Sequence, residues 1–130
     1  MRKAFLYKAA AFSCTAVVLV LSVLPDLHPS PDVGNIDKVY HFLAYLVLGW
    51  LWEGAFLNAP SFKAKGAPTA FAAAFAVSFM FGVAVEIIQS YIPYRDAETL
   101  DLLANGAGAL AGALIQMYAY KLKGRQGHET

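Results

Sequence analysis

Three groups of polar and ionisable residues are spaced so that each group lies on one face of a helix. Residues three or four positions apart in an α-helix project from the same side. Carboxyl, imidazole, phenol and amide groups can move a proton, bind a metal or hydrogen-bond a polar ligand. The members are Asp37, His41 and Tyr45, then Glu86 and Gln89, and finally Asp101 and Asn105.

Apolar residues dominate the rest of the chain. Of the 130 residues, 58% are hydrophobic and only 15% are charged. A soluble domain carries about a quarter charged residues, so this composition favours a surface that faces lipid. The net charge of +1 and the lack of a basic stripe predict no nucleic-acid partner. Cys14 is the only cysteine, which excludes an internal disulfide.

Four apolar stretches are long enough to cross a bilayer, which takes about 20 residues of helix. They cover approximately residues 4–24, 39–57, 67–92 and 100–120. No small-x-small cleavage site follows the first stretch, so we interpret it as an uncleaved span. The sequence therefore predicts an all-α integral membrane protein with four transmembrane helices in one domain, residues 1–130. Residues 25–37 are expected to form an irregular loop, and residues 124–130 a frayed tail.

The distribution of Lys and Arg predicts the orientation of the chain. Eight of the ten basic residues lie in the N-terminal segment, the connector 58–68 and the tail 121–130. Only Lys38 and Arg95 lie in the other two connections. Because basic residues gather on the cytoplasmic side, both termini are predicted to be cytoplasmic. The three polar groups then lie within about 6–10 Å of the outer boundary, where they are expected to form one polar pocket that opens to the exterior.

Several residues of this pocket allow more than one role. We interpret His41 as a structural hydrogen-bond partner ahead of a general base, with a metal ligand beside Glu86 and Asp101 least favoured. No HxH or HExxH spacing is present, so neither a metal nor another cofactor is predicted. Glu86 is the strongest functional candidate because carboxylates inside membranes are rare, although a protonated partner of Gln89 is the alternative. Asp101 either lines the pocket or caps its helix.

Two charged residues lie apart from the three groups. Arg95, in the short connector 93–99, is the cation expected to lie over the pocket. Its guanidinium suits either a salt bridge with the outer carboxylates or a lipid phosphate. Glu53 lies near the inner end of the second span. It is expected to extend toward Lys63 or Lys65 at the interface and to take no part in the site.

Small residues follow Asn105 along the fourth span. Gly108 and Gly112 form a small-xxx-small step, a pattern that lets two helix backbones approach closely in lipid. Gly82 on the third span is a candidate for the matching flat surface. Tight helix packing without chemistry is therefore the interpretation of these glycines.

The polar residues and their neighbours also form an ordered motif. It reads D-K-x-x-H-F-x-x-Y at 37–45, E-x-x-Q at 86–89, P-x-R at 93–95 and D-L-x-A-N-x-x-G at 101–108. This string resembles the VanZ-like family of small bacterial membrane proteins. Together with the connecting spans it covers residues 37–112, more than half of the chain, whereas the first span and the tail carry no part of it.

The resemblance implies a role at the bacterial cell envelope, because the family is named after a protein associated with resistance to the glycopeptide antibiotic teicoplanin. It implies a multi-pass protein of the cytoplasmic (inner) membrane that handles surface lipids, lipid-linked precursors or lipophilic antibiotics. The leading hypothesis is therefore an outward pocket that binds an envelope lipid or amphiphile. The residues expected to contact the ligand or shape the pocket are Asp37, Lys38, His41, Tyr45, Glu86, Gln89, Arg95, Asp101 and Asn105.

Two alternatives stay open at this point. One is an acid–base enzyme in which His41 and either Glu86 or Asp101 act on a lipid-linked substrate. The other is a structural module whose polar network only stabilises the helices. No nucleophile with a supporting triad is visible, so the choice between enzyme and binding protein is open, as is assembly into a homo-oligomer.

Overall fold

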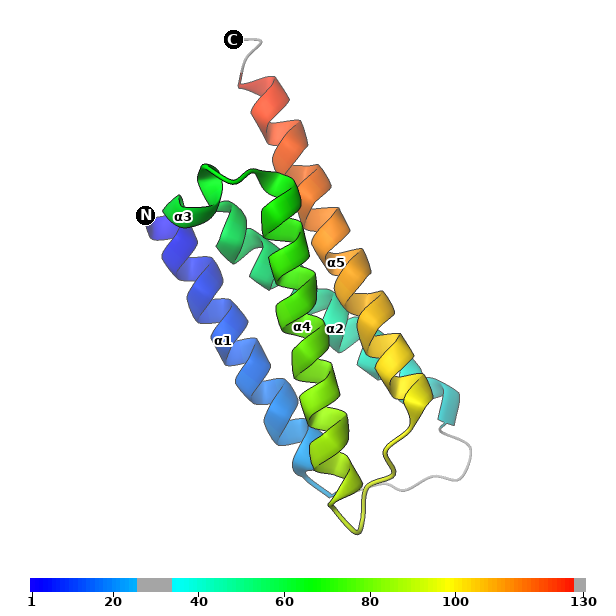
Figure 1. Ribbon diagram of the computed structural model, residues 1–130. Helices are drawn as coiled ribbons and strands as arrows, with labels where there is room; N and C mark the ends of the chain where they lie inside the picture. Colours follow the sequence, from blue (N-terminus) through cyan, green and yellow to red (C-terminus); the bar gives the residue numbers. More distant parts are fainter. Residues whose placement is uncertain (26–33, 128–130) are drawn as a thin grey trace.

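The computed structural model describes residues 1–25 and 34–127, and within these ranges the chain is helical without any strand. The described residues form four long helices and one short one, whose arrangement is drawn in Figure 1. The elements are α1 (Arg2–Val23), α2 (Gly34–Leu57), α3 (Pro60–Lys63), α4 (Ala67–Ser90) and α5 (Thr99–Gln126). The all-α fold predicted from the sequence is thus confirmed.

The helix ends follow from local chemistry. α1 ends just before Pro25, which disfavours helical backbone in the residue that precedes it. Gly66, with a φ of 86°, adopts the left-handed conformation that separates α3 from α4. Pro68 lies in the first turn of α4, where a missing N–H leaves no hydrogen bond broken.

Two predicted irregular segments are partly helical. Residues 34–37 belong to α2, and the predicted loop also includes residues 26–33, which lie outside the described residues. The frayed tail expected from residue 124 is wrong for its first residues, because α5 continues to Gln126. Lys123 and Arg125 lie in the last turn of α5, where basic side chains interact favourably with the helix dipole. Residues 128–130 of the predicted tail also lie outside the described residues.

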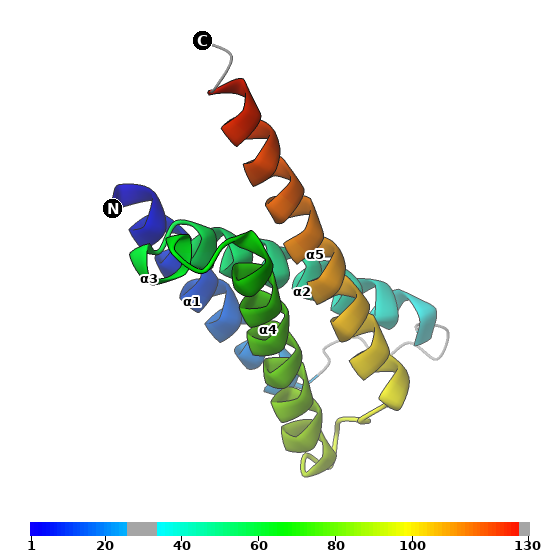
Figure 2. The same ribbon diagram turned by 45° about the horizontal axis from the view of Figure 1, so that its top comes forward.

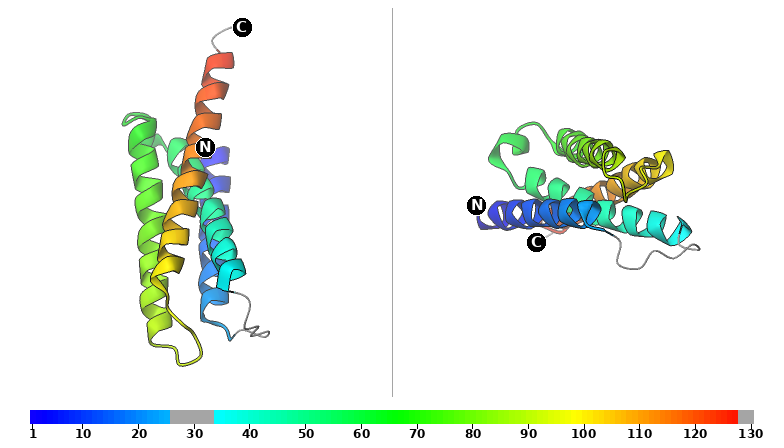
Figure 3. Two further views of the ribbon diagram at one scale, coloured as in Figure 1. Left: turned by 90° about the vertical axis from the view of Figure 1, so that its right-hand side faces the viewer. Right: turned by 90° about the horizontal axis from the view of Figure 1, so that it is seen from below.

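The helix ends that the sequence predicted to face outward lie together at one end of the bundle. In Figure 1, the end of α1, the start of α2, the end of α4 and the start of α5 lie at the lower end, opposite the start of α1 and the end of α5. Figures 2 and 3 show the same grouping from other directions. α2 is the central element because it forms the most extensive contacts with α5 and with α1 and also packs against α4, whereas α4 touches α1 only slightly. The polar segments that the sequence singled out therefore share one end.

Three helices, α1, α4 and α5, are long and apolar enough to cross a membrane. α2 is not among them, although its 24 residues give it the length. It carries Asp37, Lys38 and Glu53, and its position between the other helices shields part of its surface. Large apolar side chains are exposed along all four long helices, as a lipid-facing exterior requires.

α2 and α5 touch backbone to backbone through glycines. A Cβ added to Gly108 would collide with the carbonyl oxygen of Phe42, and one added to Gly112 with that of Leu46. Gly49 of α2 meets α5 in the same way. The close packing predicted for Gly108 and Gly112 is confirmed, but their partner is α2. Gly82 of α4 instead packs against the Tyr45 ring and the Asn105 side chain.

Candidate functional site

The starts of α2 and α5 join at a hydrogen bond between two residues of the sequence motif. His41 Nδ1 lies 2.9 Å from Asn105 Oδ1. Asn105 is fully buried, so its side chain is held in place by the surrounding helices. Because an amide oxygen only accepts, Nδ1 is the donor of this bond, and Nε2 is the ring nitrogen that faces away from Asn105.

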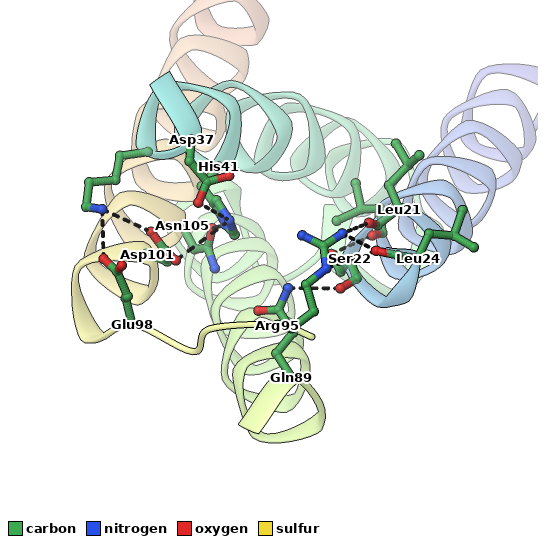
Figure 4. Close-up of polar contacts among 12 residues, drawn as sticks. Leu21, Ser22, Leu24, Asp37, His41, Gln89, Arg95, Glu98, Asp101 and Asn105 are labelled. Carbon is green, nitrogen blue, oxygen red and sulfur yellow. Dashed lines mark hydrogen bonds and ion pairs between the residues drawn. The ribbon is translucent and has the colours of Figure 1, made fainter. Parts of the chain in front are cut away.

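Two carboxylates lie on the other side of the same ring. His41 Nε2 is 3.7 Å from Asp37 Oδ2 and 4.0 Å from Asp101 Oδ2. Figure 4 shows the side chains of Asp37, Asp101 and Asn105 converging on His41 from α2 and α5. The Asp37 side chain is 48% exposed, whereas that of Asp101 is 3% exposed. The ring therefore lies between an accessible acid and a buried one.

Lys38 is the cation of this cluster. Its ammonium donates a 2.9 Å hydrogen bond to Glu98 and lies 3.7 Å from Asp101 Oδ1. Glu98 was not among the residues expected at the site; it is the residue immediately before α5 and reaches α2 through Lys38. The only feature of the sequence that could have identified Glu98 as a site residue is its position one helical turn before Asp101.

The polar residues of α4 reach in two directions. Gln89 is buried and donates a 3.0 Å hydrogen bond to the carbonyl of Ser22, near the end of α1. Both carboxylate oxygens of Glu86 are buried, and the backbone N–H of Glu98 lies close to this carboxyl group without forming a well-aligned hydrogen bond. The hydroxyl of Tyr45 on α2 has no hydrogen-bond partner among the described residues, although Tyr45 is only 1% exposed. Glu86 and Tyr45 thus place buried polar groups beside the His41 cluster.

Arg95 binds the end of α1. Its Nε donates to the carbonyl of Leu24 at 2.9 Å, and its Nη2 donates to the carbonyl of Leu21 at 2.8 Å. Tyr94 donates a further bond of 2.9 Å to the carbonyl of Val23. The last carbonyls of a helix have no partner inside the helix, so these donors satisfy them. Figure 4 shows Arg95 and Gln89 directed at this end of α1 rather than at Asp101.

A cavity of about 270 Å³ separates the two clusters. Its wall combines apolar and polar side chains from α1, α2, α4 and the connector before α5. The lining residues are Val18, Leu21, Ser22, Asp37, Tyr40, His41, Ala44, Tyr45, Gln89 and Arg95. The contribution of α1 was missed from the sequence, since Ser22 is the only polar residue it brings. A second cavity of about 260 Å³ lies between α4 and α5, and Glu86, Ser90 and Glu98 are among its lining residues.

The polar residues predicted for one pocket thus fall into two neighbouring clusters. The first joins α2 to α5 and the second joins α4 and its connector to α1, with the cavity between them. The first contains Asp37, Lys38, His41, Asp101 and Asn105; the second contains Gln89 and Arg95; Tyr45 and Glu86 lie beside the first.

Glu53 does not extend to the interface, so that prediction is wrong. The residue is fully buried, and neither carboxylate oxygen has a hydrogen-bond partner among the described residues. Its neighbour Gly54 lies against the ring of Tyr7, whose hydroxyl accepts a 3.1 Å hydrogen bond from Gln116. Glu53 is therefore a second site of buried polarity on α2, in the half remote from His41.

The comparison with known proteins agrees with this architecture. The model of the VanZ/LLP1 family matches residues 4–120 of the chain. The protein belongs to the VanZ/LLP1 family. The match begins in α1, so the first span, which carries no part of the motif, is also part of the family domain. Neither the curated proteins nor the solved structures contain a match. Together with its apolar helices, the family assignment makes this chain a VanZ-like membrane protein.

Proposed function

We propose that this VanZ/LLP1 protein spans the bacterial cytoplasmic membrane four times, with both termini inside, and that its polar cavity opens outward. The cavity binds the polar head of an envelope amphiphile. A surface lipid, a lipid-linked precursor and a lipophilic glycopeptide of the teicoplanin type all combine a polar head with an apolar tail. Binding of the last would contribute to antibiotic resistance.

The mixed wall of the larger cavity carries the proposal. Val18 and Leu21 of α1 form an apolar side, and Asp37, His41 and Gln89 form a polar side. A concave site with apolar walls and a few converging polar groups is the usual form of a ligand pocket. Because α1 is also exposed to lipid along most of its length, a tail can lie beside the cavity while the head enters it.

The hydrogen-bonding groups favour a head that donates. Lys38 is held by Glu98 and Asp101, and Arg95 by the carbonyls of α1. The acceptors facing the cavity include the half-exposed carboxylate of Asp37 and the amide oxygen of Gln89, which has no partner in the described structure. Sugar hydroxyls or an amine therefore suit the cavity better than a phosphate, the headgroup that the sequence suggested for Arg95.

Filling the cavity is expected to abolish binding of the head. Ala44 lines the cavity, so Ala44→Phe places a ring where the head would lie. Ala76 of α4 is exposed, and Ala76→Phe adds the same volume on the outer surface. With protein in lipid nanodiscs and a fluorescent long-chain alkyl glycoside as the probe, we expect Ala44→Phe to weaken binding at least tenfold and Ala76→Phe to leave it unchanged.

Two further probes are compared with the glycoside in the same assay: an alkyl phosphate of the same chain length, and teicoplanin. The glycoside and teicoplanin are expected to bind more tightly than the phosphate, since the cavity offers acceptors. Equal binding of the glycoside by wild type and Ala44→Phe would overturn the proposal. Tighter binding of the phosphate would restore the headgroup role of Arg95.

Acid–base catalysis is the second candidate, and the His41 ring favours it. Asn105 fixes the ring with Nε2 beside one exposed and one buried carboxylate, and His41 itself lines the cavity. A ring held this way can take up a proton from a hydroxyl of a bound head. Conversion of a lipid-linked substrate by wild type, lost in both His41→Ala and Glu86→Gln while helicity is retained, would establish the enzyme.

A further inference from the structure

Three ligand atoms from two helices converge at the outer end of the bundle. One carboxylate oxygen of Asp37, one ring nitrogen of His41 and one carboxylate oxygen of Asp101 all lie within 4.8 Å of one another. We infer that these three residues bind a divalent transition-metal ion of the Zn²⁺ type. One imidazole and two carboxylates form a donor set that such ions accept, with water or a ligand completing the coordination.

The orientation of His41 prepares it for a metal. Its Nδ1 donates to Asn105 Oδ1, so Nε2, which faces the two carboxylates, is the nitrogen that a metal ion would bind. Histidines that bind metals usually donate their other ring N–H to an oxygen, because this bond fixes the tautomer and the ring plane. Asn105 is fully buried and supplies that oxygen.

The burial of the Asp101 carboxylate supports a bound ion independently of the convergence of the three residues. The residue is 2% exposed, yet its Oδ1 has no hydrogen-bond partner in the described parts of the chain. Its two ion-pair contacts are long, 3.7 Å to Lys38 Nζ and 4.0 Å to His41 Nε2. A buried carboxylate without close partners is costly, so such groups are usually satisfied by water or a cation. An ion placed between Asp101 and His41 would satisfy both.

The local charge and the spacing both suit a dication. The cluster contains the carboxylates of Asp37, Glu98 and Asp101 against one ammonium, that of Lys38. Zn²⁺ bonds to N and O ligands are about 2.0–2.2 Å long, so two ligands on one tetrahedral ion lie about 3.3–3.6 Å apart. The distances of 3.7 and 4.0 Å around Nε2 are slightly larger. The Asp37 side chain is exposed enough to rotate inward and close the site.

The metal site does not depend on the amphiphile proposal, because no lipid or sugar takes part in it. Glu86, which the sequence associated with His41 and Asp101 as metal ligands, is not one of the three converging residues. It lines the other cavity, between α4 and α5. A cation at this position would itself present an open coordination site toward the larger cavity, which Asp37 and His41 line.

Metal titration of the purified protein tests the inference. Protein in mild detergent is stripped with a chelator and titrated with ZnCl₂ by calorimetry, with Co²⁺ absorption as a second readout. We expect one ion per chain. His41→Gln and Asp101→Asn should each weaken Zn²⁺ binding at least tenfold, and His41→Gln should also change the Co²⁺ spectrum.

Asp96→Asn is the matched control, since Asp96 is an exposed acid in the connector between α4 and α5, outside the three proposed ligands. It should bind Zn²⁺ as wild type does. If Asp101→Asn fails to fold, Asp37→Asn takes its place as the test variant and should also weaken Zn²⁺ binding. The half-exposed side chain of Asp37 can be replaced without disturbing the core. Wild-type binding that is absent, or that is equal in Asp37→Asn and Asp96→Asn, would overturn the metal site. Glycoside binding measured in chelator tests the amphiphile proposal separately.

Discussion

Gly112→Ala is expected to lower the free energy of unfolding by about 2–3 kcal/mol, the cost typical of an overpacked interior. The added methyl group would meet the carbonyl oxygen of Leu46 and the backbone nitrogen of Trp50. Since the obstacle is backbone and not the end of a flexible side chain, α2 and α5 must move apart. In lipid, helix association depends on close van der Waals contact, so this separation is costly. Unfolding in mixed micelles, followed by circular dichroism, measures the loss.

Gly124→Ala supplies the control on the same helix. Nothing lies within 4 Å of a Cβ at Gly124, and alanine is a better helix former than glycine by about 1 kcal/mol. This variant is therefore expected to be neutral or slightly stabilised. Gly108→Ala should behave like Gly112→Ala, because it meets the carbonyl of Phe42. Equal stabilities for the Gly112 and Gly124 variants would contradict the direct packing of α2 on α5.

Glu53→Met is expected to stabilise the protein by about 1–3 kcal/mol, the range found for a buried polar group without a partner. The carboxyl group of Glu53 is fully buried and has no hydrogen-bond partner within the described residues. Methionine has a similar shape and no such requirement, and replacing buried charged groups by apolar ones is often stabilising. The same micelle unfolding experiment measures the gain.

Glu53→Gln separates shape from polarity. Glutamine keeps two unsatisfied polar atoms at the same place, so we expect a much smaller gain than for Glu53→Met. A loss of stability in Glu53→Met would show that the carboxyl group has a partner, such as an ion or a water molecule. In that case the buried surroundings of Glu53 would be a binding site in their own right.

The long helices and the shared end of the polar groups could be predicted from the sequence. Hydrophobic length marks a helix that must bury its backbone in lipid, and the three- and four-residue spacings place side chains on one face. His41 and Asn105 were therefore expected at similar depth, and the structure joins them by a hydrogen bond. The start of α2 was harder to predict, because polar residues such as Asp37 and Lys38 resemble a loop until other helices are seen to pack around them.

The partners of individual charges could not be predicted. Arg95 was expected over the carboxylates, but hydrogen bonds to Leu21 and Leu24 depend on where α1 ends in space, and no motif encodes that. Glu53 was expected to reach the interface, yet burial of its side chain depends on how α2 lies among its neighbours. Periodicity reports which residues share a face. It does not report which helix covers that face.

Accessibility of His41 and Glu86 tests the central claim, that polar groups of different helices meet at one outward-facing end of the bundle. Single cysteines replace each residue in a Cys14→Ser background, and spheroplasts are treated with a small membrane-impermeant thiol reagent. Both His41→Cys and Glu86→Cys are predicted to react from outside, whereas Lys121→Cys should react only after permeabilisation. Reaction of His41→Cys and Glu86→Cys from opposite sides of the membrane, or of both only from the cytoplasm, would contradict the account.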